Sequence, residues 1–394
     1  MRVAMQFRAL PGKHGHITIL ERIAYMDLNQ IITALMLVFL VIGAVDYVLD
    51  NRFGLGKEFE QGVMACGRLT LCMAGFMVLA PLIAQQLGPM VSPLFRSLGI
   101  DPSILAGILL ANDAGGAALA MELADSEQAG LFSGLIVGSM LGTTVMLNIP
   151  TIMSFASKEE RPAVIYGILC GIITIPLGCL AGGLAAGFSV KLIVINTVPV
   201  LLLSVLLLVM LLTLGEKIVP LFSVLGKLLT SIAIFGLVCG AVESLTGFSI
   251  FQGMNTLDSV FPIVGNISVF LAGAFTLLAV IRRAFSHALI RIGQLLGTNS
   301  CSVSALLLAI ANSMPAIMLI HDMDDRGKLL NIAFLTSAGC ILGDHLAYTS
   351  QVAPQLCLPV IIGKFVGGIT AFIAAMLLIH SSATFSSAFP KYHN

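Results

Sequence analysis

Long apolar runs separated by short polar connectors repeat along almost the whole chain. Each run holds about 20 residues, and a helix of that length spans the roughly 30 Å hydrocarbon core of a bilayer. We therefore expect an all-α, polytopic membrane helix bundle of about 10–11 transmembrane helices. The predicted spans lie near residues 28–49, 62–88, 102–122, 129–155, 163–188, 191–214, 219–243, 262–282, 301–320, 328–351 and 356–380.

Composition narrows the function classes. Hydrophobic residues make up 58% of the chain and charged residues only 10%, with a formal net charge of zero. A soluble domain with this composition would expose large apolar patches, and the chain lacks the basic surface expected of a nucleic-acid-binding protein. The eight cysteines form no CxxC pair, so they predict small buried apolar residues and no metal centre. No cofactor-binding motif is evident.

The chain divides into one large domain and two short ends. Residues 27–383 form the predicted polytopic transporter domain, and residues 384–394 form a C-terminal tail. Residues 1–26 are interpreted as an N-terminal extension, because Met26 begins a segment typical of a natural start. A start assigned too far upstream is one explanation of this extension.

Basic connectors predict how the helices are oriented. With eleven spans, the basic residues before the first span, after the fourth and after the eighth lie on one side of the membrane. The positive-inside rule then favours a cytoplasmic N-terminus in a bacterial inner membrane. Basic residues on the opposite side oppose this prediction: Arg52, Lys57, Arg326 and Lys328.

An internal sequence similarity, here called the internal echo, predicts a structural repeat. Residues 109–125 align without gaps on residues 309–325, so that Asn112 matches Asn312 and Asp125 matches Asp325. Transporters are often built from repeats whose helices are broken by Gly or Pro at the site. The repeat halves would be about 62–188 and 262–380, parallel by the span count and inverted if either half contains a re-entrant hairpin. Chance similarity between two apolar segments is the alternative.

Ionisable residues at membrane depth are the candidate site residues, because burying a charge in hydrocarbon costs several kcal/mol. Asp113 lies in the middle of an apolar run, beside Asn112, and is followed by Gly115 and Gly116, which would free backbone carbonyls there. A role in binding the substrate or a coupling ion is the prediction. A protonated, hydrogen-bonded carboxyl that serves packing alone is the alternative.

Two further groups join this candidate site. Asp344 and His345 lie inside the tenth predicted span, where their side chains should point about 100° apart, so that only one of them faces a given cavity. Structural pairing with a neighbouring helix is the competing explanation. Asn312 and Pro315 mark a break in the ninth span, and such breaks also occur for architectural reasons alone.

Several separated motifs together resemble one family. The chain from about residue 27 to 380 closely resembles the ethanolamine permease family of bacterial ethanolamine-utilisation systems. The motifs that carry the resemblance are LLANDAGG (109–116), TIPLGCLAGGL (174–184), DRGKLLN (325–331), LGDHL (342–346) and IGKFVGGITA (362–371).

The resemblance implies uptake of ethanolamine, a small solute that is mostly a cation at neutral pH. Asp113 and Asp344 would accept the ammonium, and Asn112, Asn312 or His345 would bind the hydroxyl. Besides ethanolamine, the expected partner is the lipid bilayer and not a nucleic acid. Coupling to H⁺ or Na⁺ and assembly into a homo-oligomer remain open.

Three rival functions remain. An ion-coupled transporter of another small amine or amino alcohol would share these residues. An intramembrane enzyme is disfavoured, because the residues before Asp344 do not form the GxGD pattern of membrane aspartyl proteases and neither HExxH nor GxSxG occurs. A receptor or scaffold without a transport cycle is the third rival.

Overall fold

The computed structural model of the chain describes residues 28–285, 291 and 293–380. Within these residues every regular element is a helix, which confirms the predicted all-α class. The expected extension (1–26) and tail (384–394) lie outside the described residues. The helices are α2 (Leu28–Val48), α3 (Gly56–Leu69), η1 (Thr70–Ala74), α4 (Gly75–Ser97), α5 (Ile104–Leu109), η2 (Asn112–Gly116), α6 (Ala117–Leu123), α7 (Glu127–Leu131), η3 (Phe132–Gly142), η4 (Thr144–Asn148), α8 (Ile149–Phe155), α9 (Arg161–Ala185), α10 (Val190–Leu214), η5 (Gly215–Ile218), α11 (Val219–Thr246), α12 (Leu257–Ala284), α14 (Ser300–Ala311), α15 (Ser313–Met318), η6 (Ile320–Asp322), α16 (Asp325–Ala338), α17 (Asp344–Val352), η7 (Pro354–Leu356) and α18 (Cys357–His380).

Eight helical segments of the described chain are long and apolar enough to cross a membrane. They correspond to eight of the eleven predicted spans. The predicted span 328–351 is instead two helices, α16 and α17, separated by a non-helical break at residues 339–343. The other two predicted spans, 102–122 and 301–320, have a different form.

These two segments are hairpins, and their prediction as full spans is wrong. In hairpin 1 (residues 101–125, with α5, η2 and α6) the backbone N–H of Asp125 donates to the carboxylate of Asp101 over 3.1 Å, so both ends lie together. In hairpin 2 (residues 299–324, with α14, α15 and η6) the N–H of Asn299 donates to Asp324 over 2.9 Å. Each hairpin therefore returns to the face from which it starts.

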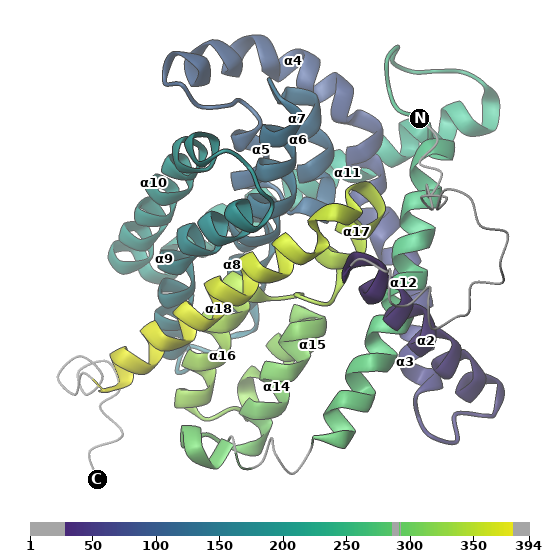
Figure 1. The fold of residues 1–394 in the computed structure, drawn as a ribbon. Coiled ribbons are helices and arrows are strands. Elements are labelled where there is room, and N and C mark those ends of the chain that lie inside the picture. Colours follow the sequence, from purple (N-terminus) through teal and green to yellow (C-terminus); the bar gives the residue numbers. More distant parts are fainter. Residues whose placement is uncertain (1–27, 286–290, 292, 381–394) are drawn as a thin grey trace, which may run out of the picture.

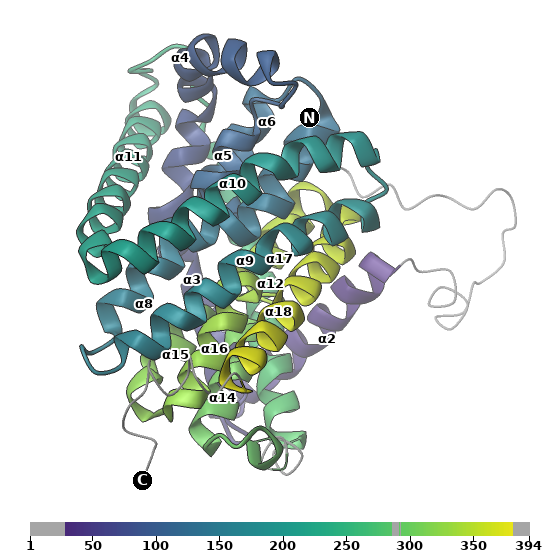
Figure 2. The ribbon, with the colours of Figure 1, turned by 90° about the vertical axis from the view of Figure 1, so that its left-hand side faces the viewer.

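The hairpins start from opposite faces of the bundle. The base of hairpin 1 contacts the start of α10, where the Asn196 side chain accepts from the N–H of Asp101 over 2.9 Å. The base of hairpin 2 contacts the connector before α9, where His321 Nδ1 lies 3.0 Å from Glu160 Oε2. These contacts lie at opposite ends of α9, whose 25 residues span about 37 Å. Figures 1 and 2 show hairpin 1 at the top of the molecule, here called the upper face, and hairpin 2 at the bottom, the lower face.

The two opposed hairpins give the internal echo a structural counterpart. Asn112 and Asn312, which the alignment matches, both lie where their hairpin is broken between two helices. Because the hairpins start from opposite faces, these segments are related by inversion and not as the parallel copies that the span count implied. The equivalence of the complete halves, 62–188 and 262–380, stays a prediction.

The hairpins also change the topology. The loop after α2 lies at the lower face, since Arg282 Nη2 at the end of α12 is 3.3 Å from Glu58 Oε1, and α12 leads into hairpin 2. Leu28 therefore lies at the upper face, opposite the connectors that follow the predicted fourth and eighth spans. The expectation that these two connectors share a face with the start of the first span is wrong, because hairpin 1 does not cross the membrane.

Basic residues favour the lower face as the cytoplasmic one. Among the described residues near the upper face, Arg96 and Lys191 are the basic ones, whereas the lower face holds Arg52, Lys57, Lys158, Arg161, Lys217, Arg282, Arg283, Arg291, Arg326 and Lys328. By the positive-inside rule, we expect the lower face inside the cell and Leu28 at the outer side.

Reporter fusions in a bacterial host test this orientation. Green fluorescent protein fused to the C-terminus should fluoresce, because α18 ends at the lower face. Alkaline phosphatase should be active when fused after Gly253, between α11 and α12 at the upper face, and inactive when fused at the C-terminus. The reverse pattern would contradict the assigned orientation.

Glycines bring α9 and α18 into close contact. A Cβ on Gly178 would lie 2.7 Å from the carbonyl oxygen of Gly363, and a Cβ on Gly363 would lie 2.8 Å from that of Gly178. Small residues at such crossings let backbones approach closely in lipid, where packing drives helix association. The glycine motifs seen in the sequence therefore join these two helices at the centre of the bundle.

An ion pair fastens α16, which follows hairpin 2, to the connector before α9. Lys328 Nζ at the start of α16 lies 3.2 Å from Glu160 Oε1, and both side chains are at most 10% exposed. Burial raises the pKa of the Glu160 carboxyl, but hydrogen bonds from Ser157 and the Lys328 ammonium outweigh burial and hold the pKa below its usual value of 4.5. The Glu160 carboxyl is thus ionised at neutral pH.

Glu160→Gln should lower the thermal stability of the detergent-purified protein at pH 7. Removing one partner leaves the buried Lys328 with only the Asp325 carboxylate, and breaking a buried pair costs about 3 kcal/mol. Because the folded pKa of Glu160 lies below the unfolded value, its stabilisation is present above about pH 4.5 and lost as the pH falls further. The difference in Tm from wild type should therefore shrink at pH 4. Equal Tm values at pH 7 would contradict this assignment.

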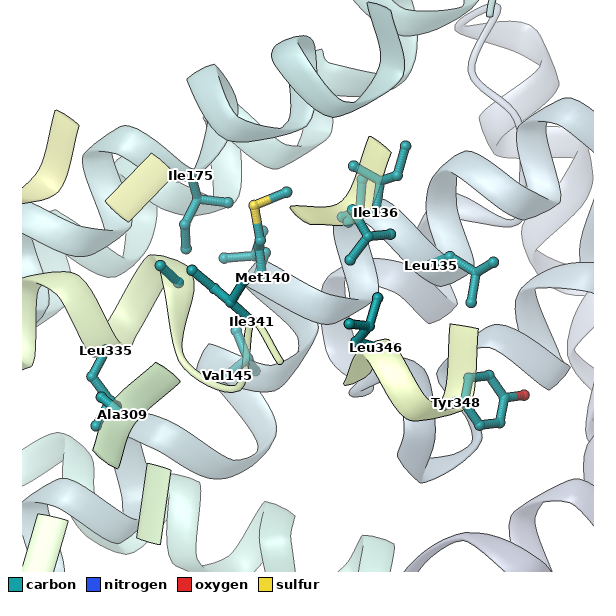
Figure 3. Packing of buried hydrophobic residues seen from close by; sticks show 14 of the residues in the cluster. Leu135, Ile136, Met140, Val145, Ile175, Ala309, Leu335, Ile341, Leu346 and Tyr348 are labelled. Carbon is teal, nitrogen blue, oxygen red and sulfur yellow. The ribbon is translucent and has the colours of Figure 1, made fainter. Parts of the chain in front are cut away.

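Apolar side chains from both halves of the chain pack around the centre. Figure 3 shows Met140 of η3 with Ile175 of α9 and Ile341 of the break before α17, and Leu135 near Leu346 and Tyr348 of α17. Leu135, Met140, Leu346 and Tyr348 are at most 2% exposed. This packing holds the broken segments that carry the candidate site.

Candidate functional site

Three breaks in helices meet at the centre of the bundle. In hairpin 1, Ala111 is extended and Gly115 has a φ of 92°. In hairpin 2, Asn312 is extended, and between α16 and α17, Cys340 has a φ of 59°. Irregular backbone at membrane depth is tolerated only where its polar groups find partners within the protein or a cavity.

The breaks satisfy one another's backbone groups. The N–H groups of Cys340 and Leu342 donate to the carbonyls of Ala309 and Ile310 in hairpin 2, over 2.8 and 3.0 Å. From hairpin 1, the Asn112 amide donates to the carbonyl of His345 over 3.2 Å. The start of α17 is therefore held between the tips of the two hairpins, which brings Asp344 and His345 to Asp113.

Asp113 is buried beside the imidazole of His345. Its side chain is 7% exposed, and its Oδ1 lies 3.8 Å from His345 Nε2. Asn112 is fully buried next to it. Three buried oxygens here have no hydrogen-bond partner in the described part of the chain: Asn112 Oδ1, Asp113 Oδ1 and Asp344 Oδ1. A buried acceptor without a donor costs stability, so this cluster is suited to a ligand that brings donors.

Asp344 and His345 both lie in the cluster around Asp113, whereas only one of the two side chains was expected to face a given cavity. His345 is buried, whereas Asp344 is half-buried as the first residue of α17. A carboxylate oxygen of Asp344 and a ring nitrogen of His345 lie within 4.8 Å of each other and of Cys340 Sγ.

A buried cation approaches the imidazole from its other side. Lys364 of α18 is 1% exposed, its ammonium donates to the carbonyl of Gly339, and its Nζ lies 2.6 Å from His345 Nδ1. An ammonium can only donate, so Nδ1 accepts and the imidazole carries its proton on Nε2. Nε2 faces Thr143 Oγ1 at 3.2 Å and Asp113.

The glycines after Asp113 shape the tip of hairpin 1. A Cβ on Gly115 would lie 2.3 Å from the Cβ of Phe76, and one on Gly116 would lie 2.6 Å from the carbonyl oxygens of Leu110 and Ala111. These glycines therefore allow the close turn that places Asp113, and no contact in the structure assigns them a ligand.

Asn312 and Pro315 lie beside the cluster without joining it. The Asn312 side chain accepts from the N–H of Met314 over 3.0 Å and so caps α15. Pro315 is exposed in the first turn of that helix, where a missing N–H is tolerated. The break in hairpin 2 is at Asn312 and not at Pro315. A substrate contact by either residue stays a prediction.

Three members of the cluster are closed to both faces, whereas Asp344 is half-buried. Asn112, Asp113 and His345 are at most 5% exposed. A surface pocket of about 370 Å³ opens at the base of hairpin 1, lined in part by Arg96, Asp125 and Lys191, and it does not reach Asp113. A solute reaches Asp113 only after the hairpins or their neighbours move.

A metal centre fits these residues poorly. Thiolate, carboxylate and imidazole are ligands of Zn²⁺, and Cys340, Asp344 and His345 lie close enough to share an ion. However, His345 Nδ1 is occupied by Lys364, and Nε2 faces Thr143 and Asp113. The imidazole therefore has no nitrogen free for a metal.

Comparison with known proteins assigns the family. The family model described as "Ethanolamine utilisation protein, EutH" matches residues 28–378. The chain is 46% identical over 346 residues to a Listeria monocytogenes protein named "Probable ethanolamine permease EutH", with 88% of this chain and 93% of the relative covered. It is 36% identical to a Salmonella typhimurium protein of the same name, over 90% of this chain and 96% of the relative. The chain belongs to the EutH family. No solved structure matches it.

Membership of the EutH family supports a multi-pass membrane transporter, as the sequence predicts. The match includes both hairpins, the broken pair α16 and α17, and all of the buried cluster. A Bacillus subtilis relative, 38% identical over 350 residues, bears only the name "Uncharacterized protein YxeR". The names of the relatives given as permeases favour transport over the enzyme alternative.

Lys364 is the member of the cluster that the sequence reasoning missed. It lies in the motif IGKFVGGITA, through which the chain resembles the EutH family, but the predicted site residues include no lysine. A signal was present, because Lys364 stands alone in an apolar run from 357 to 379. An isolated lysine at mid-span indicates a partner in the bundle interior.

Proposed function

We propose that this EutH-family protein carries ethanolamine across the bacterial inner membrane as its ammonium ion, with Asp113 as the principal binding group. The observation that carries the proposal is the set of three buried acceptor oxygens without donors, on Asn112, Asp113 and Asp344. A primary ammonium brings three N–H donors and one positive charge, and it is the form that most ethanolamine takes at neutral pH.

The charges favour a cation at this place. The carboxylates of Asp113 and Asp344 are near enough to repel each other. A cation bound between them removes that repulsion. Its attraction to the carboxylates also offsets the free energy that the cation loses when it leaves water. Asn112 and the His345 imidazole supply neutral groups for the hydroxyl of the same molecule.

Selectivity for a primary amine follows from the residues available. Quaternary ammonium groups are usually held by aromatic faces, with Trp the most effective, and this chain contains no Trp. A trimethylated nitrogen also has no N–H to donate to the three oxygens. Choline is therefore expected to be a poor substrate.

Uptake into liposomes tests the proposal. The purified full chain should give saturable uptake of labelled ethanolamine above protein-free liposomes, competed by unlabelled ethanolamine and at least about tenfold less well by choline or ethylene glycol. Stronger competition by another small amine would favour the alternative, a transporter of that amine. Uptake equal to protein-free liposomes would contradict a carrier and favour a scaffold.

A further inference from the structure

The buried cluster holds an unusual set of charges. Two carboxylates, Asp113 and Asp344, and one ammonium, Lys364, lie around the imidazole of His345. The imidazole lies between Lys364 Nζ at 2.6 Å and Asp113 Oδ1 at 3.8 Å, so the ammonium and this carboxylate face opposite edges of one ring. Among the described residues, no direct ion pair joins Lys364 to either carboxylate.

Other titratable groups surround these four without changing the count of charges. Cys72 of η1 and Tyr348 of α17 lie near Asp113, and Cys340 lies beside Asp344. All three are neutral in their ordinary form. Arg68 of α3 also acts on Asp113, but it is exposed and, in the described part of the chain, forms no hydrogen bond or ion pair with the four groups, so it is not part of this buried set.

The set is one positive charge short of neutrality. With His345 kept neutral by the adjacent ammonium, two carboxylates and one ammonium sum to a charge of minus one. An uncompensated charge at this depth costs several kcal/mol, so the cluster is stable when one more positive charge is present. One ethanolammonium ion supplies that charge, and one proton on a carboxylate supplies it equally.

We propose that the site takes either one ethanolammonium ion or one proton, with Lys364 as the fixed charge that sets this number at one. The inference rests on the proposed function. When ethanolammonium binds, the O–H bond of the protonated carboxyl breaks, its proton goes to water on the open face, and the carboxylate pairs with the substrate ammonium. The charge inside the site is zero in both states.

This scheme makes transport an electroneutral exchange. The carrier returns with a proton after it releases ethanolammonium, and no net charge crosses the membrane. A carrier that returned empty would instead move one charge in each cycle, and a membrane potential would drive it.

Binding measured against pH tests the competition. The Kd for ethanolamine of the detergent-purified full chain should be measured between pH 4.5 and 8.5. In the acidic part of this range the Kd should rise about tenfold for each unit by which the pH falls, because two ligands that exclude each other are linked reciprocally. Calorimetry in buffers of different ionisation enthalpy should show release of about one proton per substrate there. A Kd independent of pH would overturn the exchange while leaving the proposed function intact. Competition by Na⁺ at fixed pH would also overturn it, because sodium would then be the alternative occupant.

The charge count is tested separately by paired variants. Asp344→Asn keeps an acceptor oxygen but makes the set neutral, and Lys364→Met makes it minus two; each should lower uptake at least about tenfold. The double variant restores minus one and should recover uptake to within about threefold of wild type. A purely structural ion pair also predicts recovery of Tm, so the deciding measurement is proton release per substrate, which should return to about one in the double variant. Lys158→Met, an exposed lysine between α8 and α9, is the matched control.

Imposed gradients complete the test. In proteoliposomes the initial rate of ethanolamine uptake should not change when a potassium gradient with valinomycin makes the interior negative. A rate that rises with the potential would overturn electroneutral exchange. Absence of any ethanolamine binding or uptake would remove the proposed function, and this inference with it.

Discussion

Asp113→Asn should lower the initial rate of ethanolamine uptake at least about 100-fold while the protein still reaches the membrane. The substitution keeps the size of the side chain and one acceptor oxygen, but removes the charge that faces the substrate ammonium. Truncating one partner of a buried charge pair costs about 2–5 kcal/mol, and each 1.4 kcal/mol is tenfold in binding. Uptake of labelled ethanolamine into proteoliposomes measures the rate.

Asp258→Asn is the control for this substitution. Asp258 is exposed in the first turn of α12, so this substitution makes the same chemical change far from the cluster. Its uptake should equal wild type. If Asp113→Asn also transports at the wild-type rate, with similar amounts of protein in the membrane, Asp113 is not the group that binds the ammonium.

The sequence predicted the membrane helices well because their signal is local. An apolar run of about 20 residues has one stable form in lipid, and eight predicted spans are continuous helices. The same signal could not separate a span from a hairpin. In residues 102–122 apolar runs flank Asn112 and Asp113 over the length of a span, and the bond from Asp125 to Asp101 that closes hairpin 1 depends on the folded chain.

Part of the candidate site was also predictable, because its charged residues are a local signal in the sequence. Asp113, Asp344 and His345 stood out because each is costly in hydrocarbon, and the structure brings all three together. Their partners come from distant parts of the chain, such as Thr143 of the η3 and η4 region and Lys364 of α18. Without the fold, the sequence gives no means of choosing which polar residues meet.

Gly115, at the tip of hairpin 1, stands out in the sequence, but its role is visible only in the structure. Gly115 was predicted to free backbone carbonyls for a ligand, but its φ of 92° and its contact with Phe76 give it another task. It lets the chain turn tightly enough for Asp113 to face His345 while η2 packs against α4. The position of the carboxylate thus depends on the conformation of Gly115.

Gly115→Ala should lower both uptake and thermal stability. A positive φ costs a residue with a Cβ about 1–2 kcal/mol, and overpacking against Phe76, 2.3 Å away, adds about 1–3 kcal/mol. We expect the tip to shift, which moves Asp113 away from His345 and lowers the uptake rate at least about tenfold. Uptake in proteoliposomes and the Tm in detergent measure the two effects.

Gly67→Ala in α3, where nothing lies within 4 Å of the new Cβ, should leave both unchanged or raise the Tm slightly. Wild-type uptake and Tm in Gly115→Ala alone would show that the tip tolerates a side chain, and the close turn would then not be what positions Asp113.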